Sequence, residues 1–389
     1  MQEALPYYPK IRVEFYLDMI FFNAILMHTC AFPHNNYPNK LKNFKSITIK
    51  ELARRAGVSH STVSRALNNH PAIAHETIER IQQLARELNY VPSGFARSLK
   101  TNRSYMLGVI VHRIADPFYS EVLAGIQSVA HQFRYSVFVS AFESDIERQD
   151  SLIRGVFGRQ ADALIIGDSF FTSEHVDELG IRVPTVFIHN RAEVLPHSIY
   201  HDDVNATRAL TRHLLDLGHR RIAFGGNQRG GILHQQRRDG VVTELKTAGL
   251  ELCRAYDVTA PDGQMSSGVW LARQLLDMPE RPTAILCFND MQAIGVMQTL
   301  QQANVRIPED ISVVGFDDIP LAEFLYPALT TYRQPIWELG QMAAKVALNL
   351  LGENLNGTLV SEPLITMRGQ LIVRRSTAPP TTKRTGIQG

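Results

Sequence analysis

A cluster of short hydroxyl side chains distinguishes the stretch GVSHSTVSRALNNHP, residues 57–71. Ser and Thr are only moderate helix formers, because their side chains compete for backbone hydrogen bonds and favour caps and turns. On an exposed surface, the same hydroxyl groups can donate and accept hydrogen bonds. We therefore expect these side chains to bind a partner outside their own helix. They are Ser59, Ser61, Thr62 and Ser64.

The apolar residues around this stretch have the spacing of three helices, within residues 48–57, 59–67 and 75–90. Thr48 and Ser59 are the predicted N-caps of the first two helices, and the glycine between these helices suits a left-handed turn. Two helices joined by a tight turn and braced by a third form a helix-turn-helix unit, which places its second helix in the major groove of DNA. Short hydroxyl side chains let that helix approach bases and phosphates closely.

The distribution of charge supports contact with DNA. The whole chain has a formal net charge of +2, with 40 basic and 38 acidic residues. Residues 47–104 hold nine basic and four acidic residues, which is a local net charge of +5. Electrostatic contact with phosphates requires such a local excess of basic residues.

From residue 105 onward, short apolar runs alternate with helical segments. The runs are rich in β-branched residues and lack strict alternation, which is typical of parallel strands buried on both faces. Seven such strands and further C-terminal ones exceed one small sheet, so we predict two α/β lobes with parallel sheets flanked by helices. The strands are expected within residues 105–111, 135–142, 161–167, 183–189, 220–226, 282–290 and 311–316.

At this point the chain resembles the lactose-repressor/galactose-repressor family of transcription regulators. The motifs AGVSxSTVSRALN, ELNYVPSGFARSL, ADPFYSEVLAGI, HLLDLGHRRIAF, FNDMQAIGVM and VVGFDDIPLAEFLYPALTT occur in the family's order, and the resemblance covers residues 46–377. It implies an N-terminal helix-turn-helix domain followed by a two-lobed domain similar to periplasmic sugar-binding proteins. It also implies a homodimeric repressor that binds a pseudo-palindromic operator under the control of a small molecule.

The resemblance implies roles for individual residues in DNA binding. His60 and Ser61 open the recognition helix and select bases, and Arg65 also reaches the major groove. Ala96 and Leu99 enter the minor groove from a hinge, where an apolar wedge kinks the duplex. The remaining candidates hold phosphates: Thr48, Ser59, Thr62, Ser64 and Asn68.

The resemblance also implies a cleft between the lobes for a carbohydrate-like effector. An acid, an amide and an arginine together suit the hydroxyl groups of a polyol. Many relatives carry an aromatic residue that stacks on the ligand where this chain has Gly263, so that platform is either missing here or supplied by Phe118, Phe170 or Tyr256. The expected effector contacts are Asp116, Phe118, Arg237, Asn289 and Asp317.

These observations predict five segments and a cytoplasmic protein. Three dispersed cysteines suit a reducing compartment, and the apolar run at residues 19–32 is too short to span a membrane. The predicted segments are a poorly ordered extension at 1–46, a helix-turn-helix domain at 47–91, a hinge at 92–104, a two-lobed effector and dimerisation domain at 105–377 and a disordered tail at 378–389.

Two other classes of protein are alternatives to a regulator. A solute-binding module without a regulatory role is the main alternative, although a basic three-helix head is unsuited to export. An enzyme is disfavoured, because we find no catalytic constellation, no metal-ligand spacing and no cofactor motif. The glycine-rich GGNQRGG at residues 225–231 lacks the lysine and hydroxyl ending of a nucleotide-binding loop, so we expect it to line the cleft.

The first prediction concerns the recognition helix. Exchange of both His60 and Ser61 for other side chains should change the preferred operator sequence, because these residues are expected to contact base edges. Selection of bound duplexes from a random library measures the preference. An unchanged preference would show that the recognition helix is placed wrongly.

Overall fold

The structure of the chain is a computed structural model that describes residues 47–88, 90, 103–142, 150–151, 153–155, 161–353 and 364–381. The predicted roles of Ala96 and Leu99, the extension at 1–46 and most of the hinge lie outside these residues. Contacts divide the chain into two compact units, Met1–Ser93 and Gly94–Gly389. The bounds of the predicted segments remain predictions.

The first unit contains three helices, α2 (Ile49–Ala56), α3 (His60–Leu67) and α4 (His75–Glu87). Thr48 and Ser59 cap α2 and α3, because each side chain accepts a hydrogen bond from the backbone N–H three residues later. Gly57, with φ of 67°, makes the turn between these helices. Small and aliphatic side chains from all three helices form the core: Leu52, Ala53, Ala56, Val63, Ala66, Ile81 and Ala85.

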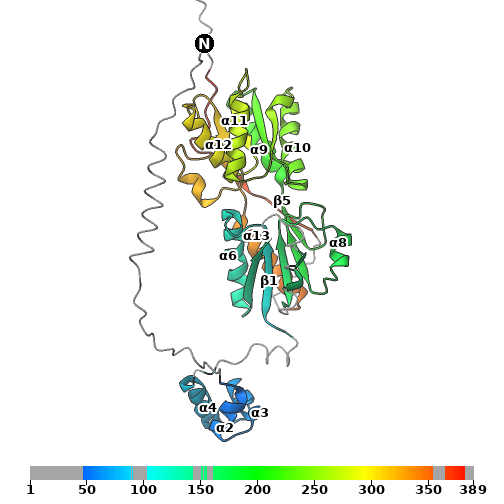
Figure 1. The fold of residues 1–389 in the computed structure, drawn as a ribbon, viewed down its shortest axis with the longest axis vertical. Helices are drawn as coiled ribbons and strands as arrows, with labels where there is room; N and C mark the ends of the chain where they lie inside the picture. The colour runs from blue at the N-terminus through cyan, green and yellow to red at the C-terminus, as the bar shows by residue number, and fades with distance from the viewer. Residues whose placement is uncertain are drawn as a thin grey trace, which may run out of the picture. The chain divides into compact units, whose positions relative to one another are not determined.

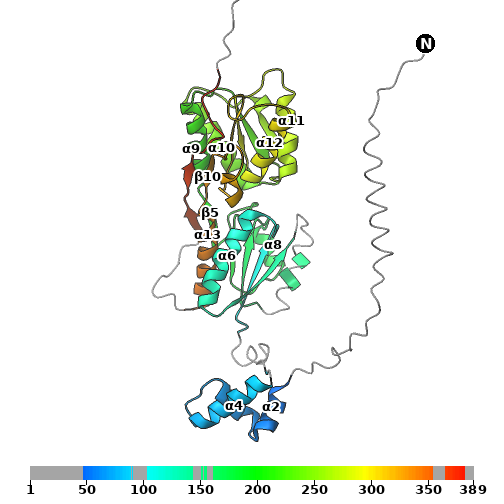
Figure 2. The same ribbon diagram turned by 90° about the vertical axis from the view of Figure 1, so that its left-hand side faces the viewer.

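The second unit consists of two α/β lobes, which Figures 1 and 2 show one above the other. The first lobe has a six-stranded parallel sheet in the order β11-β5-β4-β3-β1-β2. Its strands are β1 (Met106–Val111), β2 (Ser136–Ala141), β3 (Ala163–Gly167), β4 (Thr185–Ile188), β5 (Ser198–His201) and β11 (Leu364–Met367), and its helices are α6 (Pro117–Gln132), α8 (Ser173–Glu178) and α13 (Ile336–Leu350).

The second lobe has a four-stranded parallel sheet in the order β7-β6-β8-β9. Its strands are β6 (Ile222–Asn227), β7 (Asp257–Ala260), β8 (Ala284–Cys287) and β9 (Ser312–Val314). Its helices are α9 (Asp203–Asp216), α10 (Ile232–Thr247), α11 (Met265–Leu276) and α12 (Asp290–Gln302), with short 3-10 turns η1 (Arg254–Tyr256) and η2 (Pro320–Glu323). The predicted fold of two parallel α/β lobes is confirmed.

The chain crosses between the lobes three times. The first crossing joins β5 to α9, and the other two contain β10 (Thr331–Arg333) and β12 (Gln370–Ile372), which pair antiparallel. Figure 2 shows β5 and β10 at the junction of the lobes. Within the predicted tail, Ala378 hydrogen-bonds to Ser312 and Thr381 to the carbonyl of Glu309, so the packed part of the chain extends to Thr381.

Each lobe contains two helices that cross at paired glycines. A Cβ atom on Gly125 of α6 would lie 2.1 Å from the backbone oxygen of Trp337, and one on Gly340 of α13 would lie 2.0 Å from the oxygen of Val122. Gly268 of α11 and the facing glycine of α12 form the same kind of contact. These crossings are therefore backbone against backbone.

Gly125→Ala should lower the free energy of unfolding by about 1–3 kcal/mol or more, because the added methyl group overlaps a backbone carbonyl. Gly155→Ala is the matched control, since a Cβ at Gly155 would meet no atom of the described residues within 4 Å beyond its own helix backbone and chain neighbours. Its effect should stay within about 1 kcal/mol. Chemical denaturation measures both variants, and equal effects would contradict the close crossing.

Candidate functional site

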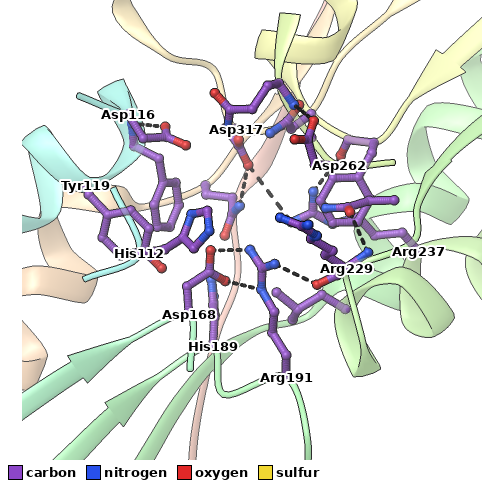
Figure 3. Close-up of a pocket in the computed structure, with 18 residues that line it drawn as sticks. His112, Asp116, Tyr119, Asp168, His189, Arg191, Arg229, Arg237, Asp262 and Asp317 are labelled. Atoms are coloured by element: carbon purple, nitrogen blue, oxygen red, sulfur yellow. Dashed lines mark hydrogen bonds and ion pairs between the residues drawn. The ribbon is translucent and has the colours of Figure 1, made fainter. Parts of the chain in front are cut away.

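A cavity of about 60 Å³ lies between the two lobes, where the strands of both sheets end. Parallel α/β folds place ligand-binding groups at the carboxyl ends of their strands. Figure 3 shows Asp116 and Tyr119 of the first lobe opposite Arg237 and Asp262 of the second. Lining residues at or just after strand ends are His112, Asp168, His189, Asn227, Phe288 and Asp317.

The five predicted effector contacts all line this one cavity: Asp116, Phe118, Arg237, Asn289 and Asp317. Asp116 is the N-cap of α6, and its Oδ1 accepts a hydrogen bond from the Phe118 amide at 3.0 Å. Asn289 caps α12 in the same way, with the Gln292 amide 2.9 Å from its Oδ1. Two of the candidate side chains are thus oriented by helix starts.

Arg237 is fixed on several sides. Its Nε donates to Asp203 Oδ2 at 2.7 Å and its Nη1 to the Phe288 carbonyl at 2.5 Å. Its guanidinium carbon lies 4.3 Å from the centre of the Phe288 ring and 3.8 Å from that of Phe316. Its Nη2 lies 4.0 Å from Asp317 Oδ1. That separation is too long for a hydrogen bond, so a ligand oxygen could be shared between the two groups.

Asp317 is buried and holds an unusual backbone conformation. Its side chain accepts a hydrogen bond from Gln334 Nε2 at 2.7 Å. Burial raises the pKa of Asp317 well above its ordinary value, although the nearby charge of Arg237 opposes this rise. Its φ is 116°, and cavity-lining Asp168 and His189 have φ of 60° and 53°. Strained backbone of this kind is common at binding sites and costs on the order of 1–3 kcal/mol per residue.

Three buried polar atoms in the cavity wall have no hydrogen-bond partner among the described residues: Tyr119 Oη, His189 Nε2 and Gln334 Oε1. Each of these three residues is no more than 3% exposed. Burial lowers the pKa of His189 to about 4, so its ring is neutral at pH 7. Buried polar atoms normally have partners, and a polar ligand in the cavity could supply them.

Arg191, which the sequence did not single out, joins the lobes at the edge of the cavity. It forms an ion pair with Asp168 of its own lobe. Across the junction, its Nη1 donates to the Arg229 carbonyl at 2.6 Å and its carbonyl accepts from the Ile232 amide at 3.0 Å. Arg229 lies within the glycine-rich stretch 225–231, and Ile232 follows it directly. Asn227 and Arg229 of this stretch line the cavity, as predicted.

The wall lacks an aromatic residue at Gly263, where a Cβ would lie 3.0 Å from Asn289 Nδ2. Of the three aromatic residues considered as replacements, Phe118 lines the cavity. Tyr256 donates its hydroxyl to the Glu280 carbonyl, and Phe170 lies 5.5 Å from the Arg191 guanidinium. Neither of these two residues is part of the cavity wall.

The DNA-binding candidates of the first unit lie on α3, at its two caps, and at the start of α2. Ser59 Oγ lies 2.7 Å from Ser61 Oγ and 2.9 Å from Thr62 Oγ1, so the hydroxyl groups form one connected group. Thr62 and Ser64 are half-buried. The exposed candidates are Thr48, Ser59, His60, Ser61, Arg65 and Asn68.

Asp317→Asn should stabilise the unliganded protein. A folded-state pKa above the ordinary value means that the folded state binds more protons, so its stability falls as the pH rises above the ordinary Asp range. The amide avoids this loss, and each pKa unit corresponds to about 1.4 kcal/mol. The gain, measured by urea denaturation, should therefore grow between about pH 4 and pH 7.

Asp318→Asn is the matched control for this prediction. Asp318 forms ion pairs with Arg333 at 2.6 Å and with Arg374 at 2.7 Å, so its replacement should cost stability. If Asp317→Asn stabilises the protein equally at all pH values, ionisation of the buried carboxyl is not the cause of the stabilisation.

Comparisons with known proteins identify both parts of the chain. Residues 48–93 match the model of bacterial regulatory proteins of the lacI family, and residues 211–377 match that of a periplasmic binding protein-like domain.

In the part of the chain that the structure describes, no helix has the length and apolar character needed to cross a membrane.

The chain is similar over most of its length to known regulators. It is 34% identical to the ribose operon repressor of Escherichia coli K12, over 78% of this chain and 92% of that protein. The lac repressor dimer bound to operator and the anti-inducer ONPF matches with a TM-score of 0.76 and 27% identity, over 86% of this chain and all of that one.

A ribose-bound regulator from Enterococcus faecium matches with a TM-score of 0.61 and 27% identity, over 70% of this chain and 99% of that chain. The match of residues 48–93 to a regulatory DNA-binding model excludes the alternative of a solute-binding module without a regulatory role. The chain therefore belongs to the lacI family of bacterial regulatory proteins, and it is a DNA-binding transcriptional regulator rather than an enzyme.

Proposed function

We propose that this regulator is a cytoplasmic repressor that binds a pseudo-palindromic operator as a homodimer and that a small polyol in the cavity controls its affinity for the operator. The three unpartnered polar atoms of the cavity wall carry the effector part of this proposal. A molecule with several hydroxyl groups can satisfy all three, since each hydroxyl both donates and accepts.

The size of the cavity limits the effector. A volume of about 60 Å³ accommodates roughly four water molecules, so even a single sugar ring requires the lobes to separate slightly, and a disaccharide requires a larger separation. Arg237 and Asp317 would share one ligand hydroxyl, which accepts from the guanidinium and donates to the carboxylate. The ring of Phe118 would supply an apolar face. The ribose ligand of the similar Enterococcus faecium protein agrees with an effector of this size.

DNA binding is assigned to the first unit. His60, Ser61 and Arg65 are exposed on α3 and would contact base edges in the major groove. Thr48, Ser59, Thr62, Ser64 and Asn68 would hold phosphates, and Ala96 and Leu99 would enter the minor groove. Two copies related by a twofold axis would bind the two halves of the operator.

A thermal-shift screen of the full-length protein tests the effector. D-ribose and other monosaccharides should include a ligand that raises the melting temperature, whereas disaccharides should not. At a concentration one hundred times its dissociation constant, a ligand adds about 2.7 kcal/mol of stability. Arg237→Gln should reduce the shift at the same ligand concentration, because it removes the guanidinium that donates to the ligand. Absence of any shift with monosaccharides, or a shift with disaccharides only, would contradict the proposal.

Operator binding is tested separately, on genomic fragments at several salt concentrations. The repressor should select a pseudo-palindromic site, and its affinity should fall steeply with added salt because phosphate contacts release counterions. The effector of the thermal-shift screen should change the affinity for that site. Equal affinity for all duplexes, with and without the effector, would contradict the function.

A further inference from the structure

Behind the cavity, three buried side chains form a continuous chain of hydrogen bonds. His201 Nδ1 lies 2.8 Å from Asp203 Oδ1, and Arg237 Nε lies 2.7 Å from Asp203 Oδ2. The side chains of His201 and Asp203 are fully buried, and that of Arg237 is 4% exposed. Because a carboxylate can only accept, His201 donates its Nδ1 proton. Both oxygens of Asp203 are thus used inside the protein.

This chain of contacts crosses the junction of the lobes. His201 is the last residue of β5, where it pairs with Met367 in the sheet of the first lobe. Asp203 is the first residue of α9 in the second lobe, and Arg237 lies on α10. The His201 ring also packs against Phe316, with ring centres 5.7 Å apart. Asp203 therefore connects a cavity-lining arginine to the sheet of the opposite lobe.

Two buried carboxyl groups compete for the charge of Arg237. Burial disfavours ionisation of Asp203, but the charge of Arg237 and the hydrogen bond from His201 together hold its pKa well below the ordinary value. Burial raises the pKa of Asp317, and the charges of Asp290 and Asp116 raise it further. The guanidinium is thus paired with Asp203 and stays 4.0 Å from Asp317.

The gap between Arg237 and Asp317 is the place where a ligand hydroxyl would fit. Without the carboxylate of Asp203, the nearest acidic partner of the guanidinium would be Asp317. A direct ion pair between Arg237 and Asp317 would close the gap and occupy both groups. We propose that Asp203 is a positioning residue for effector recognition, which holds Arg237 away from Asp317 and links it through His201 to the first lobe. The identity of the ligand in this inference rests on the proposed function, whereas the position of Arg237 does not.

Asp203→Asn in the full-length protein tests the geometry without any ligand. The pKa of Asp317, followed by carbon NMR of labelled aspartate carboxyls, should fall because the guanidinium moves toward it. Asp202→Asn is the matched control: Asp202 is the neighbouring residue, caps α9 and pairs with Arg368 at 3.3 Å. It should leave the pKa of Asp317 unchanged. An unchanged pKa of Asp317 in Asp203→Asn would overturn the proposal.

Binding of D-ribose, measured by calorimetry, tests the consequence for recognition. Asp203→Asn should weaken it by about tenfold or more. In a protein that already carries Arg237→Met, Asp203→Asn should cause no further loss, because Asp203 acts through Arg237. Additive losses would show a merely structural role and overturn the proposal.

Two outcomes keep the inference separate from the proposed function. If D-ribose does not bind the unmodified protein, the choice of ligand is wrong, and the pKa of Asp317 still decides the role of Asp203. If Asp203→Asn does not fold, the double variant Asp203→Asn, Arg237→Met removes both buried charges. If this double variant folds, the folded state needs the carboxylate of Asp203 only to balance the buried charge of Arg237. The pKa of Asp317 is then measured in Asp203→Ser, which leaves a small polar side chain.

Discussion

The carboxyl ends of two parallel sheets meet across one narrow gap, and the rest of the structure depends on this arrangement. The residues that follow the strands line the gap, such as His112 after β1, Asp168 after β3 and Asp317 after β9. The gap also removes these groups from water, which makes each unpaired polar atom costly. The cavity therefore collects polar groups and at the same time requires a polar molecule to satisfy them.

The two arginines Arg191 and Arg237 in the gap are neutralised by different carboxylates. Arg191 and Asp168 neutralise each other at the edge and tie the lobes together. Arg237 lies deeper, between two phenyl rings, and is balanced by a carboxylate outside the cavity. Because Arg237 pairs with that carboxylate and not with Asp317, an oxygen of Asp317 stays available for a ligand. Such a division favours recognition of hydroxyl groups, which both donate and accept.

The elements with strong local patterns could be predicted from the sequence. The caps at Thr48 and Ser59 and the turn at Gly57 depend on a few neighbouring residues, and each is found as expected. The apolar runs of β1, β3 and β6 were equally clear. The strands β5 (SIYH) and β7 (DVTA) could not be predicted, because polar residues interrupt their apolar character. The six-residue α8 carries too little periodic signal.

The site was predictable only where a motif resembled the family or a side chain followed a recognised strand. His112 and Asp168 both follow predicted strands, so the rule for strand ends could have identified them. Tyr119, Arg191 and Gln334 could not be found in this way. Their roles arise from contacts between segments that are far apart in the chain, such as that of Arg191 with Arg229.

The paired glycines of α6 and α13 have a mechanical consequence. A crossing without a side-chain layer has no rotamers that could absorb a shift, so movement of one helix passes directly to the other. Helix α13 begins three residues after β10, in one of the crossings between the lobes. The first turn of α6 carries Phe118 in the cavity wall. We therefore expect a shift of α13 at the lobe junction to displace the cavity wall at Phe118, and a shift of that wall to displace α13.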